Sequence, residues 1–572
     1  MRFRLFLLIT LTLIILACGG GGGGGSSASG ELVYTTDWAG TAGSQKLSIR
    51  TADGKLVKTA ALERISAGSD TYRVTGLPEG SLSLSLDLFS QPGLGGVKSG
   101  TLETQVTIQG QTAFQTRVGA QPQSLRITPA SADLDVPEGV RFRVLALDAS
   151  GIPTFTAPGS IAWQLVGSVG SISSDGALIT SSPGSATVRA THATSGKVAT
   201  APITVAPSSP TTAKWTILIH MNAASDLYEF SDLNMRQMEQ VSGNPDVRFV
   251  VQWKQTQSLY DKSTFDGTRR YVVTPGGRKL VQDLGPGTDM GRPQTLKAFL
   301  DWAKVYYPAQ RYGLVVWSHG NGWRRRPEQE RTRAVSYDNE TGSAIQIWDL
   351  NSALAGHQLD FLAWDASLMQ MIEVAYEART NAKFVVGSEE SPPAEGFPYD
   401  RAFAGFRDSP DTATRDLTKG FVDAMITGYP NRKITQSVIE TTRLAELEAA
   451  IDGLATQLIA NKTALSTAYQ QVRNEAQSYS PNAGRYYRDL YDLCDRLEAL
   501  VDIPSVDAAC QNVRAKLAAA VAWEGHSALS PGSHGISIDM TPGQQFFSIA
   551  ADYGRMQFGR DNLWDDWLPV SP

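Results

Sequence analysis

Cysteine is scarce in this chain of 572 residues, which contains three, at positions 18, 494 and 510. None of the three lies in a CxxC pair or beside a histidine, so the cysteines indicate neither a zinc site nor a redox motif. Cys494 and Cys510 are sixteen positions apart on adjacent predicted helices. Outside the cytoplasm two such residues either form a disulfide or stay as two buried thiols, and the sequence leaves both interpretations open.

Long runs of a single charge are also absent. The formal net charge is −6 and there is no long basic stretch, which argues against nucleic acid as a partner. A content of 42% hydrophobic and 19% charged residues is typical of a globular protein. The chain is too long for a single hydrophobic core, and its length predicts about three or four domains.

One apolar run stands out, from Leu5 to Ala17 behind Arg2 and Arg4. It is too short to span a membrane and suits the apolar region of a signal peptide. Ile15-Leu16-Ala17-Cys18 resembles a bacterial lipobox, in which the cysteine is lipidated after cleavage; the alternative is a plain signal peptide with an incidental cysteine. We therefore expect a protein of the bacterial cell envelope, outside the cytoplasm, that contacts a membrane only through a lipid on Cys18.

Two β-rich stretches follow the N-terminus. "SLSLSLDLF" (81–89) alternates with a period of two, which predicts strands. The order Trp163, "ISSDG" (172–176), "ATVRA" (186–190) resembles bacterial group-2 Ig-like domains, modules that act as spacers or adhesive units. The expected organisation is a signal peptide (1–18), a Gly/Ser tether (19–30), a β-sandwich-like domain (31–121), an Ig-like domain (122–206), a linker (207–214) and a domain of a different kind (215–572).

From Trp215 onward, apolar runs alternate with helical patterns, which predicts a mainly parallel sheet covered on both faces. Functional groups gather at the carboxyl ends of such strands. Three predicted strands end in polar clusters here: Ser318-His319-Gly320, Asp365-Ala366-Ser367 and Ser388-Glu389-Glu390. These clusters are the candidate site.

Ser367 lies where the strand of "LDFLAWDASLMQMIEV" (359–374) is expected to turn directly into a helix over 368–379. A strand end that faces a helix N-terminus is a common place for a nucleophile. His319 follows a strand in "HGNGW" and is the best candidate for the base, while the alternative is a histidine that only caps a turn. Gly320 lets the backbone there approach a substrate closely.

The segment from Trp215 resembles the clostripain family of cysteine peptidases, family C11, which has a caspase-like fold. The motifs that carry the resemblance are "WTILIHMNAASDL", "YGLVVWSHGNGW", "WDASLMQMIEVAYE", "VVGSEESPPAEGFPY" and "HGISIDM". The resemblance implies a clostripain-like peptidase domain over 215–572, an α/β/α caspase-like fold with a helical C-terminal extension, preceded by two β-sandwich or Ig-like domains. It also implies that His319 matches the catalytic histidine and that the position of Ser367 holds the catalytic cysteine.

The resemblance implies further roles. Asp365 matches the acid of a pocket for a basic P1 residue, with Glu395 as the second acid, whereas a helix cap is the alternative for Asp365. Family members are made as single chains and cut themselves after a basic residue in the loop that here is arginine-rich (324–333), most plausibly after Arg333; a solvated charged loop is the alternative. Some members need calcium, but the residues near Asp226 and Asp338 form no recognisable loop motif, so calcium binding stays open and no other cofactor is expected.

Serine in place of cysteine changes the chemistry of attack. A Cys–His pair holds a ready thiolate, whereas a serine hydroxyl loses its proton only in the transition state and usually needs a carboxylate behind the histidine. The sequence shows no clear orienting acid for His319, and Asp338 is the only nearby candidate.

Three functional hypotheses follow. The first is an envelope lipoprotein whose peptidase domain binds Arg- or Lys-containing peptides or proteins but is silent or impaired at Ser367. The second is an active endopeptidase that uses Ser367 with His319. The third is an adhesive or scaffold protein whose Ig-like modules carry the function. The natural substrate cannot be read from the sequence.

Overall fold

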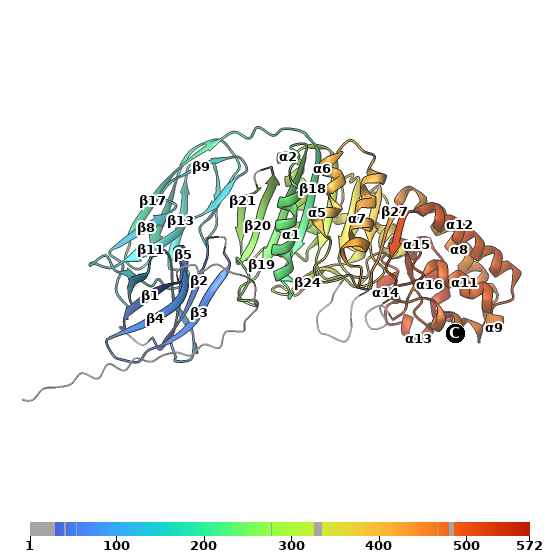
Figure 1. Cartoon of the computed structure of the whole chain (residues 1–572), viewed down its shortest axis with the longest axis horizontal. Coiled ribbons are helices and arrows are strands. Elements are labelled where there is room, and N and C mark those ends of the chain that lie inside the picture. The colour runs from blue at the N-terminus through green and yellow to red at the C-terminus, as the bar shows by residue number, and fades with distance from the viewer. Residues whose placement is uncertain are drawn as a thin grey trace, which may run out of the picture.

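The structure is a computed structural model that describes residues 29–38, 42–52, 54–275, 277–324, 334–465, 467–479 and 485–572. Cys18 and Arg333, the residues expected for lipidation and processing, lie outside the described residues. Figure 1 shows the described chain running from β-rich units at one end, through a central sheet, to a helical part at the other end.

The N-terminal part is built of strands alone, as expected. Its sheets have the orders β4-β1-β7-β12-β11-β8, β3-β2-β5-β6, β13-β16-β17-β9 and β10-β15-β14. The six-stranded sheet combines strands from both sides of the expected boundary at 121/122, because Thr154 of β12 pairs with Arg117 of β7. The strands are β1 (Ser29–Asp37), β2 (Ser44–Arg50), β3 (Leu56–Glu63), β4 (Ser69–Pro78), β5 (Gly80–Phe89), β6 (Lys98–Ile108), β7 (Gln111–Arg117), β8 (Ser124–Thr128), β9 (Ala132–Asp135), β10 (Gly139–Arg141), β11 (Arg143–Leu147), β12 (Pro153–Thr154), β13 (Ile161–Val166), β14 (Gly170–Ile172), β15 (Ala177–Thr180), β16 (Gly184–His192) and β17 (Val198–Ala206).

The central sheet has nine strands in the order β21-β20-β19-β18-β22-β25-β26-β27-β29. The five inner strands are parallel, and an antiparallel pair extends each edge. The sequence order of the inner strands reverses between β18 and β22, so the loops that follow these two strands diverge at their carboxyl ends. The strands are β18 (Ala213–Asn222), β19 (Val247–Gln255), β20 (Gly267–Thr274), β21 (Gly277–Gly285), β22 (Ala309–Trp317), β25 (Phe361–Asp365), β26 (Phe384–Gly387), β27 (Thr435–Glu440) and β29 (Val521–His526).

Helices cover both faces of this sheet, which confirms the expected α/β/α fold. One apolar cluster joins the sheet to α1, α5, α6 and α7, and a second joins it to α2, α3 and α4 and to the C-terminal helices. Side chains of β18 alternate between them, because Leu218 belongs to one cluster and Ile217 and Ile219 to the other. These helices are α1 (Tyr228–Val241), α2 (Pro293–Tyr306), α3 (Leu350–Ala353), α4 (Ile372–Ala378), α5 (Tyr399–Ala402), α6 (Ala404–Asp408) and α7 (Thr414–Gly428).

The N-terminal units dock on the exposed edge of the central sheet (Figure 1). β10 and β15 contact the edge strand β21, and Arg141 of β10 forms an ion pair of 2.9 Å with Asp283 of β21. An uncovered edge strand is a site for unwanted pairing, and this contact covers it. The expected linker (207–214) ends inside the sheet, since β18 begins at Ala213.

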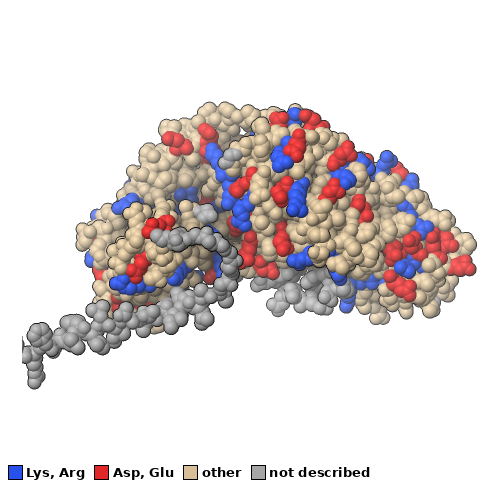
Figure 2. Space-filling model, in the orientation of Figure 1, with Lys and Arg blue, Asp and Glu red and all other residues tan. Residues whose placement is uncertain are grey.

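The surface charges are mixed. On the face shown in Figure 2, acidic and basic side chains are interspersed over the part of the chain that contains the central sheet. Ion pairs between neighbouring side chains, such as Lys419 with Asp423 and Arg514 with Glu498, occur in the described chain. That face therefore offers a ligand no broad field of one sign.

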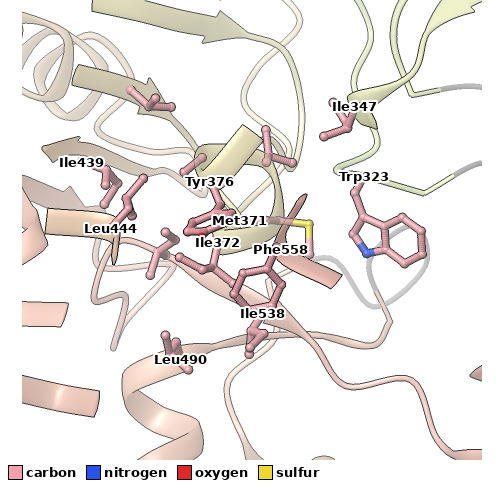
Figure 3. Packing of buried hydrophobic residues seen from close by; sticks show 14 of the residues in the cluster. Trp323, Ile347, Met371, Ile372, Tyr376, Ile439, Leu444, Leu490, Ile538 and Phe558 are labelled. Carbon is pink, nitrogen blue, oxygen red and sulfur yellow. The ribbon is translucent and has the colours of Figure 1, made fainter. Parts of the chain in front are cut away.

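The C-terminal part packs against α4 and makes the larger apolar cluster. Figure 3 shows Met371, Ile372 and Tyr376 lying against Leu490, Ile538 and Phe558. The apolar face of α8 is buried at Leu444, Leu447, Ile451, Leu454 and Leu458. The remaining elements are β23 (Val335–Asp338), β24 (Ser343–Ile345), α8 (Leu444–Ala460), α9 (Lys462–Leu465), α10 (Ala468–Glu475), β28 (Tyr487–Asp489), α11 (Leu490–Leu500), α12 (Pro504–Ala520), β30 (Ser537–Asp539), α13 (Gly543–Phe546), α14 (Ala550–Tyr553), α15 (Gln557–Asp561) and α16 (Trp564–Trp567).

The two C-terminal cysteines are free thiols in the structure. Cys494 on α11 and Cys510 on α12 are both fully buried in the larger cluster. A hydrogen bond with Cys510, together with burial, holds the pKa of the Cys494 thiol well above its usual value. Of the two interpretations that the sequence left open, the structure has the buried thiols.

None of the helices in the described part of the chain is both long and apolar enough to cross a bilayer.

Candidate active site

Ser367 lies in a turn between β25 and α4, and it caps no helix. The expected start of the helix at Leu368 is wrong, because α4 begins at Ile372 with Met371 as its N-cap. The intervening backbone is bonded to the neighbouring loop instead: the amide of Leu368 donates to the carbonyl of Glu390 at 3.3 Å, and that of Gln370 to Ser388 at 3.1 Å. Leu368 takes a positive φ of 64°, a strained conformation that sets the turn at Ser367.

His319 follows β22 and meets a carboxylate that the sequence did not single out. Its Nε2 lies 2.6 Å from Oδ1 of Asp226, a residue that follows β18. Asp338, the acid considered from the sequence, serves elsewhere: it is fully buried and forms a 2.8 Å ion pair with Lys254. The fold brings Asp226 to His319 because β18 and β22 are adjacent parallel strands whose carboxyl ends lie side by side.

Gly320 holds the two loops together. A Cβ added to Gly320 would lie 2.5 Å from the carbonyl oxygen of Ser367 and 2.9 Å from its amide nitrogen. Only a glycine therefore allows the chain after His319 to approach the Ser367 turn this closely. The approach of a substrate to Gly320 stays a prediction, and the close approach in this structure is to the Ser367 backbone.

A cavity of about 140 Å³ joins the expected site residues. It brings His319, Asp365 and Ser367 to one space at the carboxyl ends of β22 and β25. Its lining consists of Leu227, Trp317, Ser318, His319, Asp365, Ala366, Ser367, Pro392, Pro393, Ala394 and Gly396.

Asp365 is a buried carboxyl at this cavity. Burial raises its pKa to about 7, against hydrogen bonds from the amide of Phe397 at 3.1 Å and the hydroxyl of Tyr399 at 3.0 Å. Both donors come from the loop after β26, so Asp365 is held by that loop and does not cap α4. Gly396 has φ +69° and a Cβ there would come within 2.6 Å of the carboxylate, which leaves room for the Asp365 side chain.

Glu395 is placed differently from Asp365. Its carboxylate lies 3.8 Å from the guanidinium of Arg432, and it is not among the residues that line the cavity. Its backbone carbonyl accepts a hydrogen bond from Asn234 at 3.0 Å. The structure thus brings Asp365, Ser367 and His319 together at one cavity, and Glu395 is not part of the lining of that cavity.

The acids after β26 hold the C-terminal part of the chain. Glu389 is buried and accepts hydrogen bonds from the hydroxyl of Ser533 at 2.7 Å and the amide of Gly535 at 3.2 Å. Burial, reinforced by the nearby Asp489, holds the pKa of Glu389 well above its usual value. Glu389 therefore anchors "HGISIDM" to the loop after β26, a role that no local sequence pattern indicates.

Arg324, at the start of the arginine-rich stretch, is fixed to the same segment. Its Nε and Nη2 each donate at 2.7 Å to Asp539, whose side chain is fully buried, and Trp323 donates to the same carboxylate at 2.9 Å. The stretch in which a cut is expected thus begins with Arg324, whose side chain is held by Asp539. Arg333 itself lies outside the described residues.

Metal ligands are not grouped in the described residues. No three histidine, cysteine, aspartate or glutamate side chains gather there in a way that could hold an ion.

The fold and these residues define a peptidase-type α/β/α domain, and comparison with known proteins identifies its family. The model of the Clostripain family, Peptidase C11, matches residues 219–568, which is more than half of the chain. The chain belongs to the clostripain family.

The sequence identity between this chain and individual relatives is low. The chain is 28% identical to clostripain of Hathewaya histolytica over 253 residues, which is 36% of this chain and 48% of that protein. It therefore spans about half the length of the curated relative it matches.

Two solved structures cover the domain. One is an inactive zymogen C11 protease from Parabacteroides distasonis (21% identity, TM-score 0.47, 62% of this chain and 99% of that one). The other is a secreted C11 cysteine protease from Bacteroides thetaiotaomicron (16% identity, TM-score 0.48, with the same shares covered).

The Arg324–Asp539 pair gives a testable prediction about stability. Arg324→Met leaves the Asp539 carboxylate buried without its counter-charge, and we expect a loss of about 3–5 kcal/mol in the free energy of unfolding of the peptidase domain. Arg73→Met removes an exposed arginine paired with Glu31 on β1, and this control should cost no more than about 1 kcal/mol. Urea unfolding followed by tryptophan fluorescence measures both, and equal losses would contradict the prediction.

Proposed function

We propose that this protein is a bacterial envelope lipoprotein whose clostripain-family domain binds peptides through an arginine or lysine side chain at Asp365 and cleaves them poorly, because Ser367 takes the place of the nucleophilic cysteine. The observation that carries the proposal is the cavity in which Asp365, Ser367 and His319 meet. The binding group and the reacting groups then act on one bound peptide.

The preference for a basic side chain is supported by the environment of Asp365. Its hydrogen bonds within the described chain come from a backbone amide and a phenol, and neither supplies positive charge. A buried carboxyl with a pKa of about 7 is stabilised as an anion by a cation that enters the cavity. A guanidinium or ammonium group supplies that cation, and a neutral side chain does not.

Poor cleavage follows from the chemistry of the hydroxyl. A thiol beside an imidazole is already partly ionised, whereas the Ser367 hydroxyl must be deprotonated during attack. In the proposed mechanism one nitrogen of His319, Nε2, stays with Asp226. The other, Nδ1, receives the proton as the Ser367 oxygen attacks the scissile carbonyl carbon.

A second candidate, an active serine endopeptidase, is favoured by the 2.6 Å contact between Asp226 and His319. A carboxylate behind the histidine fixes its tautomer and stabilises the imidazolium, which is what serine enzymes add to a simple pair. The two candidates use the same residues and differ in the rate they predict. The adhesive-scaffold hypothesis stays a prediction.

We propose that any self-cleavage occurs after a residue beyond Arg324, because the side chain of Arg324 is bound to Asp539. Arg333 stays the proposed cut site, and Glu395 stays the proposed second acid for a basic side chain.

The decisive test of function is the exchange of Ser367. We expect little or no hydrolysis of fluorogenic Arg and Lys peptides by the wild type, at a rate close to that of Ser367→Ala. Ser367→Cys should raise kcat/KM by about tenfold or more, because it restores the thiolate. Robust wild-type hydrolysis that disappears in Ser367→Ala would instead establish the serine endopeptidase.

Binding of basic peptides should depend on pH in a direction set by Asp365. The pKa of about 7 means that the carboxyl is mostly protonated at pH 6 and ionises as the pH rises. Affinity of Ser367→Ala for an Arg peptide should therefore increase by up to about tenfold per pH unit below 7 and level off above it. Calorimetry measures this, and Asp365→Asn should bind weakly at every pH. A peptide with Gln in place of Arg is the ligand control.

Lipidation is tested in a bacterial host. Metabolic labelling with a palmitate analogue should mark the wild type and not Cys18→Ala, since the lipobox resemblance assigns the lipid to this cysteine. Label that persists in the variant would overturn the assignment.

A further inference from the structure

The first β unit reaches the peptidase domain through Arg50, at the end of β2. Its guanidinium donates to two backbone carbonyls of the loop between β19 and β20, that of Asp261 at 2.7 Å and that of Ser263 at 2.5 Å, and to Gly54 in its own turn at 2.9 Å. Gly54 has φ +92°, and a Cβ there would come within 2.1 Å of the Thr264 carbonyl. The turn after β2 therefore fits tightly on this loop.

The same loop carries Tyr260, which contacts the chain on both sides of Asp226. Its ring stacks on Tyr228 with centroids 5.4 Å apart. Its hydroxyl accepts a hydrogen bond from the side-chain amide of Asn339 at 2.6 Å. The backbone N–H of Asn339 in turn donates to the carbonyl of Ala224 at 3.0 Å. One tyrosine thus supports positions 224 and 228, two residues before and two after Asp226.

The Asp226 side chain is 71% exposed, and its carboxylate is carried by the backbone segment that these contacts support. A shift of that backbone would lengthen the 2.6 Å contact with His319. The β units are also fixed at a second place, where Arg141 bonds Asp283 and Gln282 donates to the carbonyl of Pro137. These residues belong to the second unit, and the first unit is joined to it through the shared six-stranded sheet, so both units are fixed relative to the sheet edge.

We propose that Arg50 is a positioning residue of the peptidase site: through Tyr260 the N-terminal β unit fixes the 224–228 segment so that Asp226 orients His319 toward position 367. This inference rests on the proposed function, because it takes His319 as the base at that position. It gives the β-rich part a role in the site that a spacer would not have.

The test measures the site without a peptide substrate. In the full-length chain carrying Ser367→Cys, the rate of alkylation by iodoacetamide is followed from pH 5 to 9, and the peptide that spans position 367 is quantified by mass spectrometry. Pairing with His319 should place the midpoint of the rate below the value of about 8.5 for a free thiol. Asp226→Asn should raise the midpoint and slow the reaction at pH 7.

Arg50→Ala in the same background should shift the profile in the same direction and slow alkylation at pH 7 by about threefold or more. Arg50→Lys should recover part of the loss, because an ammonium can still donate to one of the two carbonyls. Arg73→Ala, which removes an exposed arginine of the same unit, should leave the profile unchanged. Tyr260→Phe keeps the ring stack, loses the contact with Asn339 and should give a smaller shift; it serves in place of Arg50→Ala if that variant does not fold.

The outcomes separate the two proposals. A profile that moves with Asp226→Asn but not with Arg50→Ala or Tyr260→Phe overturns the positioning role and leaves the proposed function intact. A profile that does not move with Asp226→Asn overturns the assignment of His319 and Asp226 themselves. A shift with Arg73→Ala equal to that with Arg50→Ala would show a general effect of the β unit and would also overturn the role of Arg50.

Discussion

The close approach of Gly320 to the backbone of Ser367 is the contact on which the site depends. It brings the loop after β22 against the turn after β25, and a single Cβ would separate them. The turn is not free to relax into α4, because the amides of Leu368 and Gln370 are bonded to the loop after β26. The cavity lies where these strand ends are fixed in this way, and Asp365, Ser367 and His319 all line it.

A second constraint comes from buried acids that join the end of the chain to this edge. Glu389 holds Ser533 and Gly535, while Asp539 binds Arg324 in two places. Each acid lies in an apolar setting, where an unpaired carboxylate is costly. Together with the packing around Met371 in Figure 3, these contacts make the C-terminal part a support of the site strand.

The sequence predicted the parallel sheet, the strands, and His319, Asp365 and Ser367 at neighbouring strand ends, because apolar runs and their polar ends report local structure. It predicted the start of α4 wrongly, since the amides of residues 368 and 370 find partners twenty positions away. It also missed Asp226 as the partner of His319. The two are 93 positions apart, and only the adjacency of β18 and β22 brings them together. The 121/122 boundary was drawn from pattern alone, whereas the pairing of β7 with β12 runs across it.

The protonation state of Asp365 bears on what the site can bind when a serine occupies position 367. Its pKa in the folded protein is about 7, above the ordinary value of 3.8, so the folded state binds this proton more tightly than the unfolded state does. Its effect on stability is therefore neutral below pH 4, and the fold loses stability as the pH rises from about 4 to 7, by a cost on the order of a few kcal/mol. Asparagine at this position would avoid that cost and would keep one of the two acceptor oxygens that Phe397 and Tyr399 use. Asp365 lines the cavity together with His319, where the cationic side chain of the proposed ligand would offset this cost. The charge of Asp365 does not depend on the nucleophile, so the proposed binding of a basic peptide holds whether or not Ser367 reacts.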